Sequence, residues 1–212
     1  MKCYTQVYVK NSYEAAKMFG KKVIDKAMLY VEHEWYATEN NVMHGVDDNG
    51  RFVDTPDITW QGEKLDCGWW KVSQTNIGVP YGWGNASTIE EFDIGIEMGK
   101  YAGNVPEDTS RYGSWCSIGV DCSGLLTVCW ELPKKIAARD IPNIADVIDV
   151  EDIRQGDVFA KRTHVMLFKE FADNEKTKVR IIDSTRSTGK VSQREFMLKD
   201  LLEQGYLVYR KR

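Results

Sequence analysis

Apolar residues recur at helical spacing near the start of the chain. Between residues 12 and 32 an apolar side chain stands at every fourth position, namely Ala15, Phe19, Val23, Ala27 and Val31. Ser12 stands where a helix N-cap is expected, because its hydroxyl can accept a hydrogen bond from the first turn. The pattern predicts an amphipathic helix over residues 12–32 that packs one face against a core.

The next segment, residues 33–62, is polar and rich in residues that favour turns. The turn-forming groups are Asn40-Asn41, Asp47-Asp48-Asn49-Gly50 and Thr55-Pro56-Asp57. We expect a long ordered loop or a lid here. Together with the first helix it would form an N-terminal extension over residues 1–66, followed by a second domain over residues 67–212.

The second domain opens with aromatic and glycine-rich sequence and continues with a short helix and several strands. The apolar run at residues 125–130 ends before Pro133 and predicts a short buried helix with Cys122 in its first turn. Strands are expected from Val158, over residues 163–168 and over residues 179–183, and a closing helix over residues 196–202. A helix followed by a sheet is the order of an α+β domain.

Composition and charge narrow the class of protein. The 212 residues are 42% hydrophobic and 11% aromatic, as in a globular chain. No apolar run approaches the roughly 18 residues of a membrane span, and no apolar leader follows Met1. We expect a cytoplasmic protein, or a secreted one if a leader has been removed. The net charge of −4 and the lack of a basic stripe argue against nucleic-acid binding.

The five cysteines are odd in number and lack the spacing of a zinc site or a disulfide framework, so we expect thiols. Cys122 has the position of a nucleophile. A thiolate is favoured at a helix N-terminus, where free backbone N–H groups also point toward a developing oxyanion. Cys129, farther along the same helix, is expected to be buried. Cys3, Cys67 and Cys116 have no such setting and are interpreted as structural.

A general base must be one of three histidines. His164 begins an apolar strand, so its ring can stand at the strand end beside another element. His33 and His44 lie in the polar segment, outside any spacing typical of metal ligands, and are interpreted as surface or lid residues. His164 is therefore the expected partner of Cys122.

A third member follows from strand register. If the strands after Thr163 and before Ser184 form a symmetric hairpin centred on Asp173-Asn174, His164 faces Asp183. The same register pairs Phe168 with Val179 and Met166 with Ile181. Asp183 would then accept the second imidazole N–H, fix the tautomer and stabilise the imidazolium.

Four short motifs, in this order, resemble those of the NlpC/P60 family of bacterial cell-wall peptidases. They are Gly78-Val79-Pro80-Tyr81-Gly82-Trp83-Gly84, Gly119-Val120-Asp121-Cys122-Ser123-Gly124-Leu125, Gly156-Asp157-Val158 and His164-Val165. The resemblance covers about residues 78 to 184. It implies a papain-like fold, with an antiparallel sheet packed on the helix that bears the nucleophile. It also implies hydrolysis of peptidoglycan-derived peptides, often between D-glutamate and a diamino acid, with no metal or organic cofactor.

The resemblance also implies roles for single residues. Cys122 matches the nucleophile, His164 the base and Asp183 the polar third residue, a position where the family more often has histidine. Asp121 and Ser123 match positions that hold the free amine of a terminal L-alanine in some members. Tyr81 matches an aromatic residue at the cleft, and Trp83, presented by the same turn, is expected to contact the substrate.

Other readings stay open at this stage. The same cysteine and histidine would serve an amidase or acyltransferase acting on lipid or isopeptide bonds, because fold and triad do not dictate the acyl donor. A noncatalytic peptide- or glycan-binding module could keep the fold and its aromatic residues. The segment between Trp83 and Gly119, with the N-terminal extension, could narrow the cleft to small murein peptides.

Overall fold

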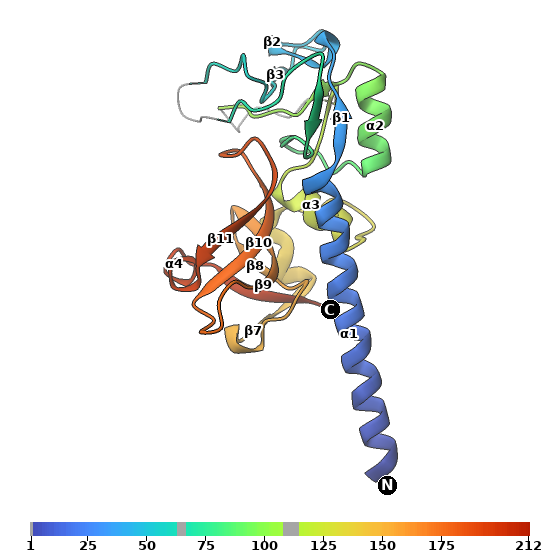
Figure 1. The fold of residues 1–212 in the computed structure, drawn as a ribbon, viewed down its shortest axis with the longest axis vertical. Helices are drawn as coiled ribbons and strands as arrows, with labels where there is room; N and C mark the ends of the chain where they lie inside the picture. The colour runs from blue at the N-terminus through green and yellow to red at the C-terminus, as the bar shows by residue number, and fades with distance from the viewer. Residues whose placement is uncertain (1, 63–66, 108–114) are drawn as a thin grey trace.

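A long helix opens the chain in the computed structural model, which describes residues 2–62, 67–107 and 115–212. Helix α1 covers Lys2–Glu32, so the expected end is confirmed and the expected start at Ser12 is wrong. Residues 2–12 contain neither glycine nor proline, and nothing local stops the helix there. The N-terminal end of α1 extends beyond the rest of the chain (Figure 1). Within the described ranges, no helix combines the length and apolar character needed to cross a bilayer.

The polar segment after α1 forms short ordered elements. They are β1 (Glu34–Tyr36), the 3-10 helix η1 (Glu39–Asn41), β2 (His44–Val46) and β3 (Phe52–Asp54). Strand β1 pairs with β4 (Thr75–Ile77), and β2 pairs with β3. The expectation of one long loop is therefore wrong in part. The turn residues at 47–50 close a hairpin, in which Gly50 has a φ of +73°.

A six-stranded sheet forms the main layer of the second half of the chain. Its order is β11-β10-β9-β8-β12-β7, and every neighbouring pair is antiparallel. The strands are β7 (Ala145–Ile148), β8 (Val158–Lys161), β9 (His164–Phe171), β10 (Lys178–Thr185), β11 (Lys190–Met197) and β12 (Leu207–Lys211). Strands β8, β9 and β10 confirm the sequence expectation, whereas β7, β11 and β12 were not predicted. The chain is a mixed α and β protein, as expected.

Further helices and short elements lie outside this sheet. They are α2 (Ile89–Glu97), α3 (Cys122–Cys129), α4 (Leu198–Glu203), η2 (Ala138–Asn143) and η3 (Val150–Asp152), with a small parallel pair of β5 (Tyr101–Ala102) and β6 (Ser117–Ile118). The closing helix begins at Leu198, because the two residues before it extend β11. Helix α3 has the expected position and ends before Pro133.

Alternate residues of the sheet face two cores, as the twofold period of a strand requires. Val165 and Leu167 of β9 and Ile182 of β10 share one buried cluster with Leu125 and Leu126 of α3. The residues between them, including Met166 and Phe168, face the opposite way and form a second cluster with Leu201 of α4. Helix α3 is thereby held against one face, with its first turn near the strand ends.

Helix α1 is tied to the same body by close backbone packing. Val23, Ala27 and Tyr30 lie in the core cluster that includes α3. Gly20 permits the approach, because a Cβ atom there would lie 2.0 Å from the carbonyl oxygen of Gln155. The predicted packing face of this helix therefore exists, although Phe19 at its outer end is 38% exposed.

Candidate functional site

Cys122 is the first residue of α3, as the sequence predicts, and its side chain is half-buried. The preceding residue, Asp121, is the N-cap, and its Oδ1 accepts a hydrogen bond of 2.7 Å from the Gly124 N–H. The N–H groups of Cys122 and Ser123 donate no hydrogen bond within the described ranges. The thiol thus sits beside two unoccupied donors at the positive end of the helix.

Two glycines let the neighbouring backbone approach this first turn. A Cβ atom at Gly124 would lie 2.0 Å from the carbonyl oxygen of Asn85, which also accepts a hydrogen bond of 3.1 Å from the Asp121 N–H. Gly119 has a φ of +147°, and a Cβ there would lie 2.5 Å from the Pro80 carbonyl oxygen. Both glycines therefore allow the backbone to lie closer than a side chain would permit.

His164 begins β9 and contacts two partners at once. Its Nε2 donates to Oδ2 of Asp183 at 2.7 Å, and the Cys122 side chain lies close enough to the ring to raise its pKa. Burial lowers the pKa of the imidazole, but the hydrogen bonds to Asp183 and Cys122, with their negative charges, outweigh burial and raise the pKa to about 9. The geometry therefore favours an imidazolium at neutral pH.

The contact between His164 and Asp183 forms, but not through the expected register. Val179 pairs with Phe171 instead of Phe168, which is a shift of three positions. A bulge between Arg180 and Ile181 then pairs Ile181 with Phe168, which reduces the shift to two. An odd shift would turn Asp183 to the other face of the sheet, whereas an even shift keeps it on the face of His164 as a diagonal neighbour.

Asp183 has a second cationic partner that sequence reasoning missed. The Asp183 side chain has no exposed surface, and Arg194 of β11 binds both of its oxygens. The Arg194 Nε lies 3.1 Å from Oδ1 and its Nη2 lies 2.5 Å from Oδ2. Arg194 could not be found from the sequence pattern, because the strand that carries it, β11, was not predicted. The two Arg194 contacts compensate the negative charge of the Asp183 carboxylate. That charge would be costly to bury if the imidazole were its only partner.

Tyr206 is a further missed residue at this site. Its ring meets the His164 ring edge-to-face, with centroids 6.4 Å apart. Burial raises the pKa of Tyr206 to about 12, and the nearby charges of Asp183 and Cys122 add to the effect. The phenol therefore remains neutral beside the imidazole and limits the room in which that ring can turn.

Tyr81 lies close to the Cys122 thiol, whereas Trp83 packs beside Tyr81. Burial raises the pKa of Tyr81, and the charges of Asp121 and Cys122 raise it further. Trp83 is partly buried against a small cluster formed by Cys67, Tyr81 and Val105. The glycine-rich turn thus brings Tyr81 to the Cys122 site, and Trp83 supports the turn from the side.

Asp121 and Ser123 already hold an ammonium group, that of Lys135. The Lys135 Nζ lies 2.9 Å from Asp121 Oδ2 and 3.1 Å from Ser123 Oγ. Asp121 Oδ2 also accepts from the Gly84 N–H at 2.9 Å, and Ser123 Oγ donates to Asp121 Oδ1 at 2.9 Å. A substrate amine could reach this carboxylate only by displacing Lys135.

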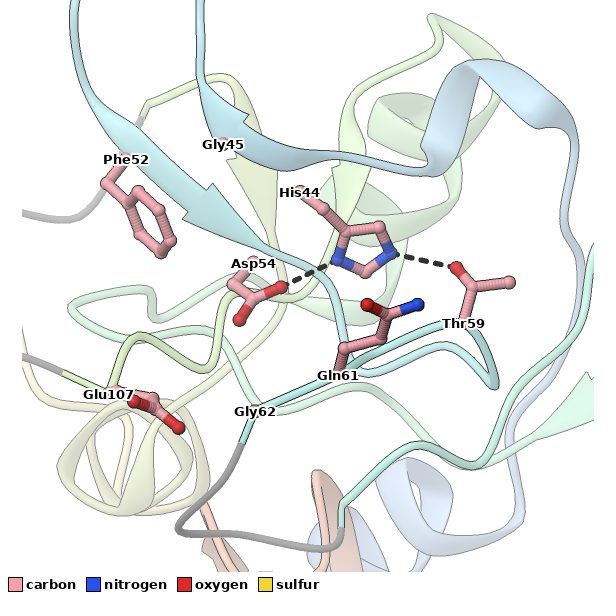
Figure 2. Close-up of a pocket in the computed structure, with 8 residues that line it drawn as sticks. All are labelled: His44, Gly45, Phe52, Asp54, Thr59, Gln61, Gly62 and Glu107. Carbon is pink, nitrogen blue, oxygen red and sulfur yellow. Dashed lines mark hydrogen bonds and ion pairs between the residues drawn. The ribbon is translucent and has the colours of Figure 1, made fainter.

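Neither of the other histidines contacts Cys122. The His33 Nε2 pairs with Asp93 Oδ1 at 2.6 Å. His44 forms part of the wall of a pocket of about 670 Å³, where Figure 2 shows its ring between Asp54 and Thr59. Its Nδ1 lies 2.6 Å from Asp54 Oδ1 and its Nε2 lies 2.9 Å from Thr59 Oγ1. The pocket in Figure 2 is thus separate from the Cys122 site, and His44 has no free ring nitrogen.

The burial of Cys129 distinguishes it from Cys122. Its side chain is 2% exposed, and burial raises the pKa of the thiol to about 12. Both cysteines carry free thiols, so exposure and the neighbouring imidazole separate them chemically. Across the ranges that the structure describes, no group of three or more His, Cys, Asp or Glu side chains has the arrangement of a metal site.

Comparison with known proteins adds no assignment to this geometry: neither a protein-family model nor a curated protein matches the sequence. The arrangement itself has a defined chemical capacity. A half-buried thiol at a helix N-terminus faces an imidazolium, whose far nitrogen is held by a buried carboxylate. These are the parts needed for nucleophilic attack on an acyl group.

Proposed function

We propose that this chain is a cysteine peptidase of the NlpC/P60 type that hydrolyses peptides derived from peptidoglycan. In this proposal the antiparallel sheet and α3 correspond to a papain-like fold, with Cys122 as nucleophile and His164 as base. The observation that carries the proposal is the chain of contacts from the Cys122 side chain through His164 to Asp183. The order of the four motifs in the sequence supports it independently.

The reaction would begin with attack of the Cys122 sulfur on the amide carbonyl carbon. The His164 pKa of about 9 keeps a proton on the ring at neutral pH, and a cation beside the sulfur favours its reaction as a thiolate. The developing oxyanion would accept hydrogen bonds from the N–H groups of Cys122 and Ser123, which have no partner in the described ranges. The helix fixes the direction of both donors before a substrate binds.

Collapse of the tetrahedral intermediate breaks the C–N bond. His164 gives its proton to the leaving amine, and a thioester on Cys122 remains. His164, now neutral, then takes a proton from a water molecule that attacks the thioester. The acid product leaves and the thiolate is restored with the imidazolium. Asp183 keeps the ring oriented throughout, because its hydrogen bond fixes which nitrogen faces the sulfur.

The proposed substrate is a short murein peptide, cleaved at the γ-D-glutamyl-diamino acid bond. We place the activity in the recycling of such peptides in the cytoplasm. A narrow substrate range is supported by Tyr81 and Tyr206, which flank the reacting pair.

The first test measures nucleophilicity without any substrate. Iodoacetamide at about pH 6 should alkylate Cys122 well before Cys129, and peptide mapping by mass spectrometry gives both rates. The variant His164→Gln should slow alkylation of Cys122 by about a hundredfold, the lower end of the range for a positioned general acid or base. His33→Gln is the matched control, since that histidine pairs with Asp93. Equal alkylation in all three proteins would contradict the role of His164.

The second test concerns the substrate. The full chain is incubated with L-Ala-γ-D-Glu-L-Lys and with its diaminopimelate analogue, and products are followed by mass spectrometry. Cleavage that disappears in Cys122→Ala supports the peptidase. A chain with an activated Cys122 that cleaves neither peptide has another acyl substrate, and a chain with an unreactive Cys122 is a binding module.

A further inference from the structure

A second concave surface lies beside the His164 end of the sheet. It is a pocket of about 470 Å³ formed by η2, by the turn between β8 and β9, and by residues leading into β12. Three cationic side chains line it: Arg139, Lys161 and Arg162. We call this surface the cationic pocket.

The three cations have no ion-pair partner in the parts of the chain that the structure describes. Asp140 is the one carboxylate among the lining residues, and it accepts from the Ala137 N–H of its own 3-10 helix. The chain as a whole carries a net charge of −4, whereas the lining of this pocket is positively charged. Like charges repel when they share a surface, and an anion placed between them removes that repulsion.

The cationic pocket adjoins the proposed catalytic histidine. Lys161 pairs with His164 across the β8–β9 hairpin, and Arg162 follows directly in the turn. The Lys161 Nζ lies 4.4 Å from the centroid of the Tyr206 ring, and that ring contacts His164 edge-to-face. The cationic pocket is therefore joined to the His164 ring through Lys161 and Tyr206.

We propose that the cationic pocket binds a carboxylate group of the peptide substrate. The inference rests on the proposed peptidase function and adds a determinant of specificity to it. Arg139 and Arg162 present planar guanidinium groups that match a carboxylate in two parallel hydrogen bonds. Lys161 adds a third positive charge and is held over the Tyr206 ring. The pocket contributes to substrate binding, and the reacting groups remain Cys122 and His164.

The experiment measures peptide binding to the full chain carrying Cys122→Ala, which prevents turnover. The probes are L-Ala-γ-D-Glu-L-Lys as the acid and the same peptide with both carboxyl groups amidated. Isothermal titration calorimetry is done on this protein and on a version with Arg139→Gln and Arg162→Gln. Both arginines are exposed, so the substitutions should leave the folded state intact, which thermal unfolding checks.

A charge-matched control removes two positive charges elsewhere. Lys71→Gln and Lys199→Gln serve this purpose, because both side chains are exposed and neither lines the cationic pocket. We expect the acid peptide to bind the arginine variant about tenfold more weakly, as for the loss of a charged hydrogen bond. The control should bind the acid peptide as the parent does, and the amidated peptide should bind all three proteins equally.

Two results would overturn the proposal, and they differ in whether the proposed peptidase function survives. If the parent binds both peptides and the arginine substitutions change neither affinity, the carboxylate is held elsewhere and the peptidase proposal stands. If the parent binds neither peptide at millimolar concentration, the substrate class itself is wrong and the inference falls with it.

Discussion

Asp183 sets the protonation of His164, and its removal gives a quantitative test of the site. The perturbation is Asp183→Asn in a Cys122→Ala background, so that no thiol titrates beside the ring. Asparagine keeps the size of the side chain and removes its charge. The pKa of about 9 in the parent reflects hydrogen bonds to Asp183 and Cys122 that overcome the effect of burial. Without both partners, burial and the positive charge of Arg194 remain; both lower the pKa, which should fall below the ordinary 6.5.

The size of the effect follows from the geometry. The His164 Nε2 and Asp183 Oδ2 lie 2.7 Å apart, and the carboxylate has no exposed surface. Unit charges about 4 Å apart at an effective dielectric constant near 20 attract by about 4 kcal/mol. Because Arg194 shares the carboxylate, we expect about half of that for the imidazolium. This corresponds to a fall of about 1.5 pH units in the pKa between the Cys122→Ala protein and the double variant.

The assay is a proton NMR titration of the histidine ring resonances. The chain has three histidines, and a His164→Gln spectrum identifies the one of interest. The reasoning is refuted if His164 titrates at the same pH with aspartate and with asparagine at position 183.

The same ion pair links stability to pH. A folded-state pKa above the unfolded value means that protonation of His164 stabilises the folded chain fully below about pH 6.5. This contribution disappears as the pH rises through the folded pKa, which is about 9 in the parent. It amounts to about 3 kcal/mol at most. Urea unfolding of the parent should therefore show a loss of stability between about pH 6.5 and 9 that His164→Gln abolishes.

Three further substitutions test separate parts of the site. Gly124→Ala should lower the free energy of unfolding by about 3 kcal/mol in urea titrations, because the added Cβ would lie 2.0 Å from the Asn85 carbonyl oxygen; a neutral result would mean that the loop moves freely from α3. Arg194→Met should raise the pKa of His164, since a competing cation leaves, and an NMR titration moving downward would contradict this. Lys135→Met should cost about 2 kcal/mol in urea unfolding by leaving the N-cap carboxylate without its cation, whereas Lys134→Met, at the exposed neighbour, should cost little.

The short helix that carries Cys122 could be predicted because its causes are local. Asp121 supplies the cap, the apolar run gives it a buried face, and Pro133 lies just beyond its end. The strand that begins at His164 is equally local in origin. Helix α1 shows the limit of such signals, because the absence of a breaker before Ser12 proved more important than a good capping residue.

The third residue of the site could be named from the sequence, but its register could not. Asp183 reaches His164 because a bulge at Arg180 changes an odd shift into an even one. A bulge depends on how both strands pack against their neighbours. A register predicted by centring the turn between the two strands assumes that there is no bulge. The agreement on Asp183 therefore came with a wrong account of how the strands pair.

The amino-acid sequence by itself determined the elements whose signals lie within a few residues: the capped helix of Cys122, the strands that follow and the pairing of thiol with imidazole as a hypothesis. Only the tertiary structure decided which distant groups complete the site. Arg194 comes from an edge strand, Tyr206 from the approach to β12, and Lys135 from a loop beyond α3. Their roles depend on charge and burial at a distance of several ångströms, and such distances are set by how the whole sheet packs rather than by any neighbouring residue.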